Sequence, residues 1–256
     1  ARMLGWKTFR RGRYLVEGGY SYDVFLSKLS RGIQDPVQVT ILPGINRAKL
    51  ASQLSLALHF NEDQIASLFS DSTFLYEKNL STEQLMGRML PETYLMYWTA
   101  TPEEVINRIL KEFDTLVADT YRSQVPDKYS LDDMIALASI IEWEAYNDEE
   151  KKRISGLYWN RLKSRMRLQA DPTVNFAIGE RRRLLFEDYE IEHPFNTYKK
   201  YGLPPAAITN PSLSSIDAAF HPEDHNYLYM VASPEGGHVF TRSFEAHQRE
   251  SAKWRQ

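Results

Sequence analysis

The sequence predicts an α+β fold in which helices predominate and the strands are short and antiparallel. Apolar residues recur at helical spacing in several long segments. The clearest pair of short strands, residues 227–231 and 238–240, is separated by PEGG, a turn sequence suited to a hairpin. Because strands do not alternate regularly with helices along the chain, a doubly wound parallel sheet is not expected.

The chain opens with a predicted β-α-β arrangement. Residues 14–16 are expected to form a short strand, and residues 21–29 a helix with Ser21 as its cap. Residues 37–42 alternate polar and apolar side chains before Pro43 and Gly44, as a half-buried strand does.

Helices are predicted after this strand. Residues 46–59 and 62–69 have the pattern of two short helices. Thr101 and Pro102 mark the start of a longer one, because threonine caps a first turn and proline is favoured at the first helical position. This helix is expected to run toward residue 121.

The next predicted helix is apolar on most of its circumference, which favours a buried position. Ser130, followed three residues later by Asp133, predicts a capping box at its start. Its apolar stripe comprises Leu131, Met134, Ile135, Ala138, Ile141 and Ala145, with Leu137 and Ile140 on a second flank. A further helix is expected over residues 151–163.

Two acids, Glu142 and Glu144, lie at the end of this apolar helix. Burial raises the pKa of a carboxyl group, and an acid kept protonated near neutral pH can serve as a general acid. The alternative is that one or both acids lie at the solvent edge of a core helix. Residues two apart on a helix point in nearly opposite directions, so these acids do not form a neighbouring pair. Either one works alone, or a partner comes from elsewhere, and periodicity does not choose between them.

Composition narrows the function classes. The 256 residues suffice for a sizeable core, and the net charge of −3 without a long basic block argues against nucleic acid as a partner. The absence of cysteine excludes disulfides and thiol catalysis. His221 and His225 flank Pro222, which predicts a loop rather than a metal-binding helix. We therefore expect no metal and no cofactor. No run of about 18 apolar residues and no signal peptide is present.

Several motifs follow one another in a recognisable order. ASIIEWE at residues 138–144 precedes NRL at 160–162, MRLQADPTV at 166–174, NTY at 196–198, GLPP at 202–205, NP at 210–211, YLYMV at 227–231 and GHVF at 237–240. In this order they resemble the YceG-like family of endolytic murein transglycosylases. The resemblance extends from about Tyr14 to the end and is densest over residues 137–240.

The resemblance implies roles for particular residues. The family's catalytic acid is the second glutamate of its Glu-x-Glu element, which corresponds to Glu144, followed by a small residue, here Ala145. Trp143 departs from the lysine common in relatives, which changes the local charge. Residues expected around the substrate cleft are Glu142, Gln169, Asp171, Thr173, Asn196, Tyr198 and His238. For most of them a scaffold role stays open, since an Asp-Pro pair alone is usually a turn and His238 could be a buried structural residue.

The resemblance also implies a domain division and a location. Residues 1–36 would form a partial LysM-like subdomain, and residues 37–256 a YceG-like catalytic domain with its core at about 129–256. Full-length relatives carry one membrane helix at the amino terminus. We therefore expect an anchor in the bacterial inner membrane that is absent from this sequence, with the catalytic domain in the periplasm. Peptidoglycan glycan strands are the expected partner, and peptidoglycan synthases are candidate partners.

The implied activity is lytic cleavage of the β-1,4 bond between N-acetylmuramic acid and N-acetylglucosamine, with Glu144 as acid and then base and a 1,6-anhydro end as product. Two rivals stay open. A lysozyme-like hydrolase would need a second carboxylate, for which Asp171 is the best candidate. A non-catalytic wall-binding module would keep the aromatic and amide residues without requiring Glu144.

Overall fold

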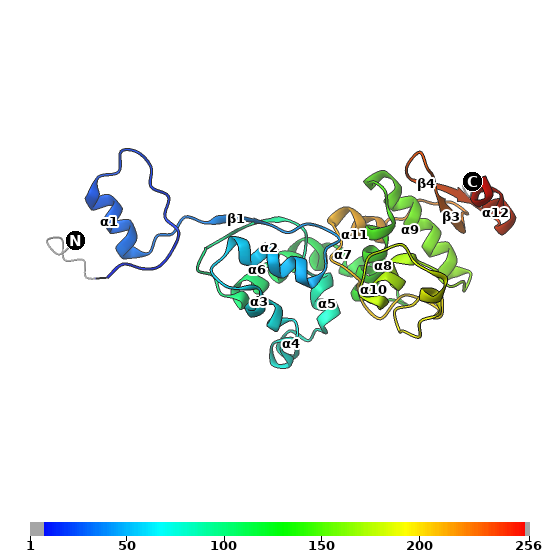
Figure 1. Cartoon of the computed structure of the whole chain (residues 1–256), viewed down its shortest axis with the longest axis horizontal. Coiled ribbons are helices and arrows are strands. Elements are labelled where there is room, and N and C mark those ends of the chain that lie inside the picture. Colours follow the sequence, from blue (N-terminus) through cyan, green and yellow to red (C-terminus); the bar gives the residue numbers. More distant parts are fainter. Residues whose placement is uncertain (1–7, 254–256) are drawn as a thin grey trace.

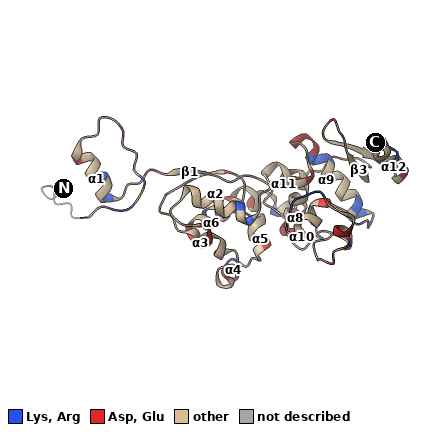
Figure 2. Cartoon of the chain, in the orientation of Figure 1, with Lys and Arg blue, Asp and Glu red and all other residues tan. Residues whose placement is uncertain are grey.

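The computed structural model describes residues 8–253. The molecule is elongated, with the helix α1 (Tyr22–Arg31) at one end and the C-terminal elements at the other (Figure 1). Two lobes lie between these ends. The first contains β1, β2 and helices α2 to α6, and the second contains α7 to α11. Acidic and basic segments are interspersed along the described chain (Figure 2).

The amino-terminal segment contains the predicted helix but not the predicted strand before it. Residues 14–16 are irregular, so the expected β-α-β opening does not form, and a LysM-like subdomain is not confirmed. The Leu15 amide donates to the Asp35 carboxylate at 2.6 Å, and the Asp35 amide donates to the Arg13 carbonyl at 2.9 Å. These backbone groups thus bond to a single residue next to β1 rather than to a neighbouring strand.

The first lobe is built on a two-stranded antiparallel sheet. β1 (Val37–Thr40) pairs with β2 (Thr93–Met96), with Val37 opposite Met96. Buried and exposed residues alternate along both strands, as the sequence predicts for β1. The predicted helices are α2 (Arg47–Ala57) and α3 (Glu62–Leu68). Two further helices, α4 (Ser72–Lys78) and α5 (Thr82–Gly87), were not predicted, because each has only one or two turns.

The long helix predicted from Thr101 is confirmed. Thr101 and Glu104 form a capping box at the start of α6 (Pro102–Phe113), with Pro102 in the first turn. The helical path continues through the π-helical turn η2 (Asp114–Ala118) into α7 (Asp119–Tyr121).

The second lobe is arranged around the apolar helix α8 (Leu131–Glu144). Ser130 and Asp133 make the predicted capping box. Eight consecutive residues of α8, from Met134 to Ile141, are buried, which confirms that the helix is apolar around its circumference. It packs against α9 (Asp148–Lys163), α10 (Asp171–Ile178) and α11 (Leu213–Phe220).

The predicted hairpin is also confirmed. β3 (Tyr229–Ala232) pairs with β4 (His238–Thr241), and α12 (Phe244–Lys253) packs on both strands. Helices with two small antiparallel sheets make the fold α+β, as expected. Two hydrophobic cores are separate: one draws on residues 37–109, the other on Leu90 and residues 113–219. Among the described residues, no helix combines the length and the apolar character needed to cross a membrane.

Candidate active site

The last turn of α8 ends at a pocket of about 320 Å³. Its walls come from α9, from the segment around residues 168–171, from Tyr198 and from the β3–β4 hairpin. The residues that line it are Glu144, Leu157, Tyr158, Arg161, Leu168, Gln169, Asp171, Tyr198, Met230, Ala232, His238 and His247. Elements far apart in the sequence therefore meet around the final residue of one helix.

Glu144 is the acid that faces this pocket. Burial raises the pKa of Glu144 to about 7, although the Tyr158 hydroxyl, which donates to its Oε1 at 2.9 Å, lowers that pKa in part. The nearby charge of Asp171 raises the pKa further, and Arg161 and Arg181 lower it. Near neutral pH the carboxyl is thus poised between its protonated and ionised forms, as acid–base catalysis requires.

Asp171 lines the same pocket from the first turn of α10. Its Oδ1 accepts a hydrogen bond of 2.6 Å from the Tyr198 hydroxyl, and its Oδ2 one of 3.3 Å from Tyr189. Burial and the charge of Asp171 raise the pKa of both tyrosines, to about 12 for Tyr189. The two phenols therefore stay protonated and hold the carboxylate in position.

Gln169 reaches the pocket through an unusual backbone conformation. Its φ of 51° lies in the left-handed region, and its backbone N–H donates to the Thr197 carbonyl at 3.2 Å. Arg161 lies beside it and fixes this segment by donating to the carbonyls of Leu168 at 2.7 Å and Leu228 at 2.6 Å. Arg161 lines the pocket but was not predicted as a site residue, although it is the middle residue of the NRL motif.

His238 lines the pocket from the start of β4. Its amide donates to Glu150 Oε1 at 2.7 Å, and its Nδ1 lies 3.2 Å from Glu150 Oε2. The start of α9 thus holds both the ring and the backbone of this histidine.

Three of the predicted binding residues, Thr173, Asn196 and Glu142, do not line the pocket. Thr173 is fully buried, and its hydroxyl pairs with Thr197 at 2.8 Å and donates to the Ala170 carbonyl at 2.7 Å. Asn196 is also fully buried, and its amide nitrogen donates to the carbonyls of Tyr189 and Ile191. Their polar atoms are thus used to shape the segments that carry Asp171 and Tyr198.

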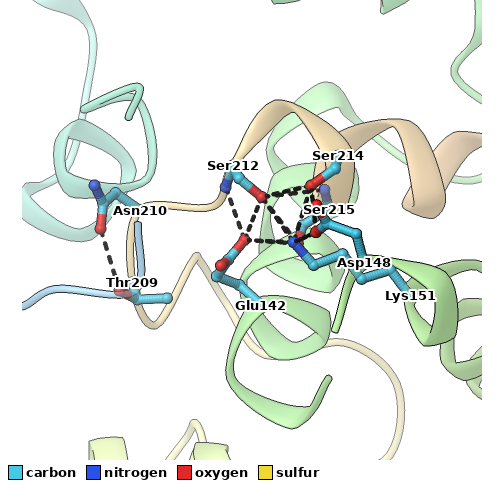
Figure 3. Close-up of polar contacts among 8 residues, drawn as sticks. All are labelled: Glu142, Asp148, Lys151, Thr209, Asn210, Ser212, Ser214 and Ser215. Carbon is cyan, nitrogen blue, oxygen red and sulfur yellow. Dashed lines mark hydrogen bonds and ion pairs between the residues drawn. The ribbon is translucent and has the colours of Figure 1, made fainter. Parts of the chain in front are cut away.

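Glu142 points toward Ser212 and Lys151 (Figure 3) and does not line the pocket that Glu144 faces. Its Oε2 accepts from the Ser212 amide at 2.9 Å, from the Ser212 hydroxyl at 2.5 Å and from the Ser215 hydroxyl at 2.6 Å. Lys151 lies 3.5 Å away and is itself paired with Asp148 at 2.6 Å. This carboxylate joins α8 to α9 and to the start of α11, outside the pocket.

Hydrogen bonds from Asn210 and Trp143 hold the two lobes together. The Asn210 amide nitrogen donates to the Leu42 carbonyl at 2.9 Å and to the Met89 carbonyl at 3.0 Å. The Trp143 ring nitrogen donates to the Gly44 carbonyl at 2.9 Å. Trp143 lies between the two acids in sequence, so the first lobe is anchored directly to the last turn of α8.

The two histidines that flank Pro222 are in other contacts. His221 pairs with Asp217 at 2.7 Å, and His225 lies 2.9 Å from the Arg153 carbonyl, in the predicted loop after α11. Within residues 8–253, no group of three or more metal-binding side chains is close enough to hold an ion.

Fold and pocket together define an α+β protein whose buried carboxyl, with its pKa near neutrality, is suited to general acid–base chemistry. By sequence, the chain belongs to the YceG-like family, whose profile matches residues 1–253.

Individual relatives agree with this membership. A protein of Bacillus subtilis named endolytic murein transglycosylase is 32% identical over 98% of this chain and 74% of its own length. A protein of the same name from Streptococcus pneumoniae is 26% identical over 99% of this chain, which spans 52% of that relative. The crystal structure of a YceG-like protein from Listeria monocytogenes matches 89% of this chain and 80% of its own, with a TM-score of 0.76 and 30% identity.

Proposed function

We propose that the chain is a peptidoglycan lytic transglycosylase that cuts glycan strands internally, between N-acetylmuramic acid and N-acetylglucosamine. The observation that carries the proposal is Glu144, a carboxyl with a pKa of about 7 on the wall of a pocket in a chain of this family. The names of the Bacillus and Streptococcus relatives support the same substrate and reaction.

In the proposed mechanism one carboxyl acts in two steps. Protonated Glu144 gives its proton to the glycosidic oxygen as the bond from that oxygen to the muramic acid C1 breaks. The positive charge that develops at C1 is stabilised by the N-acetyl group of the substrate. Glu144, now ionised, takes the proton of the muramic acid 6-hydroxyl while that oxygen bonds to C1. A 1,6-anhydro ring closes, Glu144 is protonated again, and no water is consumed.

The other pocket residues bind and orient the glycan in this proposal. Gln169, Asp171, Tyr198 and His238 line the pocket and carry groups that can hydrogen-bond to sugar hydroxyls and N-acetyl groups. Glu142, Thr173 and Asn196 support the framework, because their polar atoms are bonded to other parts of the protein. Tyr158, the one donor to Glu144 within residues 8–253, orients the carboxyl without locking it in the ionised state.

A hydrolase is the second candidate, and Asp171 is the observation that favours it. Its carboxylate lines the same pocket as Glu144, as a two-carboxylate glycosidase requires. Both Asp171 oxygens, however, accept hydrogen bonds from tyrosines, which favours a positioning role over activation of water.

The proposed substrate implies action on the cell wall outside the cytoplasm. A membrane anchor at the inner membrane, periplasmic placement and contact with peptidoglycan synthases are further parts of this proposal. They rest on the family resemblance.

Mass spectrometry of digested peptidoglycan tests the function. The expected products carry 1,6-anhydromuramic ends, and chelators should leave the rate unchanged. Muramic acid with a free reducing end as the main product would instead identify a hydrolase. An absence of cleavage, with glycan still bound, would identify a wall-binding module.

A further inference from the structure

A second hollow adjoins the catalytic pocket. Its volume is about 770 Å³, and Asp171, which also lines the catalytic pocket, forms part of its wall. Asn175 lies one helical turn further along α10 and lines it with Tyr189. The remaining wall is the segment of residues 182–187. Because the two hollows share Asp171, they lie next to each other.

The outer wall of this hollow is held in place by its own contacts. The Arg182 amide donates to Asn175 Oδ1 at 3.0 Å, which joins the wall to α10. The Arg182 guanidinium donates to both oxygens of the buried Asp188, at 2.7 and 2.8 Å, and the Leu185 amide donates to the same carboxylate at 2.6 Å. The hollow is therefore formed before any ligand arrives.

The side chains on this wall are unusual for a free surface. Phe186 is 95% exposed and Leu185 is 54% exposed, and both lie in the wall of the hollow. Arg183 and Glu187 also line it, and neither side chain has a hydrogen-bond or ion-pair partner within residues 8–253. Adjacent exposed apolar groups commonly mark a binding surface. Here they are combined with one unpaired cation and one unpaired anion.

We propose that this hollow binds the peptide carried by the muramic acid residue at the cleavage site, with Arg183 contacting a peptide carboxylate and Glu187 a peptide ammonium group. Sugar rings carry no ammonium group. The peptide of peptidoglycan combines both charges with methyl groups that suit Leu185 and Phe186. The inference rests on the proposed function, because the peptide is brought to the hollow by the glycan bound at Glu144.

The test compares three forms of uncross-linked glycan strand with the whole protein: strands with native peptides, strands whose peptide amines are acetylated, and strands stripped of peptides. Acetylation should lower kcat/KM of the unmodified protein by about 1.5-fold to fivefold, the range of an exposed charge pair, and stripping should lower it further. In Glu187→Gln, acetylation should have no further effect, since the partner of the amine is already gone.

Variants of the wall extend the test. Arg183→Ala should reduce the preference for native over stripped strands by about 1.5-fold to fivefold, and Phe186→Ala by about threefold to tenfold. Arg31→Ala and Tyr76→Ala are the matched controls, because both residues are exposed on other helices. Both controls should keep the preference of the unmodified protein.

Binding of a soluble muramyl peptide to the Glu144→Gln protein, measured by calorimetry, gives a readout that does not require cleavage. Arg183→Ala in that background should weaken binding by about 1.5-fold to fivefold. Equal cleavage of all three strands, with no effect of the wall variants, overturns this inference and leaves the proposed function intact. Failure to cleave any strand defeats the proposed function, and unchanged peptide binding in the Arg183 variant then defeats the inference as well.

Discussion

Glu142 and Glu144 lie two residues apart at the end of one helix, yet their surroundings differ. Glu142 accepts from three serine groups and lies beside the Lys151 ammonium, all on one oxygen. In the described part of the chain Glu144 accepts from one side chain, Tyr158, and its pKa is raised to about 7 by burial. Burial is the main cause of the raised pKa of Glu144, whereas Glu142 is bonded to groups that join α8 to α9 and α11.

The same comparison explains why the two acids do not act as a pair. Glu142 faces the start of α11, and Glu144 faces the pocket between α9 and α10. The second acid of the pocket is Asp171, which comes from a different helix. Substitutions in and around these acids test whether their roles differ in this way.

The largest expected effect is loss of cleavage in Glu144→Gln. The amide has nearly the shape of the acid but carries no transferable proton, so the rate should fall by about a thousandfold or more. Glu142→Gln is the matched control and should stay within about tenfold of the unmodified protein. The two rates are measured on purified glycan strands, with circular dichroism to establish folding. An inactive Glu142→Gln beside an active Glu144→Gln would reverse the assignment.

The second expected effect is a change in how stability depends on pH. The pKa of Glu144 is about 7 in the folded protein against an ordinary 4.5, so its favourable contribution is complete below pH 4.5 and is lost as the pH rises through 7. Replacing it by glutamine should therefore stabilise the protein more at pH 8 than at pH 4.5, by up to about 3 kcal/mol.

Glu142→Gln should lower the stability of the protein, whereas Glu144→Gln should raise it at high pH. Loss of the Glu142 charge weakens its hydrogen bonds to a buried cluster and should destabilise the fold by about 2 kcal/mol. Urea unfolding at the two pH values measures both variants. Equal pH dependence in Glu144→Gln and the unmodified protein would contradict a raised folded-state pKa.

A smaller effect is expected for Asp171→Asn. Loss of a positioning hydrogen bond to a charged group should slow cleavage by about tenfold to a hundredfold. Because the charge of Asp171 raises the pKa of Glu144, the alkaline limb of the pH–rate profile should also move to lower pH. A loss as complete as that of Glu144→Gln, in a folded protein, would instead support a two-carboxylate mechanism.

The smallest effect is expected for Tyr158→Phe. The Tyr158 hydroxyl lowers the pKa of Glu144, so its removal should move the alkaline limb to higher pH, opposite to the shift in Asp171→Asn. Most of the activity should remain, because the acid itself is untouched. Rates across pH 5–9 measure the shift, and limbs that move in the same direction in both variants would count against the assigned contacts.

Local rules were enough to predict much of the fold. The threonine cap at Thr101, the capping box at Ser130, the apolar circumference of α8 and the turn after Ser233 depend on neighbouring residues, and all are found in the structure. The strand predicted at residues 14–16 fails, because its backbone groups bond to Asp35 and a strand needs a distant partner. Very short helices such as α5 were missed, since six residues carry little periodicity.

By itself the sequence determined that two carboxylates end a buried helix and point in opposite directions, because helical geometry is set by spacing alone. Only the tertiary structure decided which carboxylate faces the pocket. Serines and a lysine from other helices surround Glu142, whereas Glu144 meets Tyr158 and the field of Asp171. Burial and pairing of a charge depend on residues distant in the chain, and those contacts exist only after the helices have packed together.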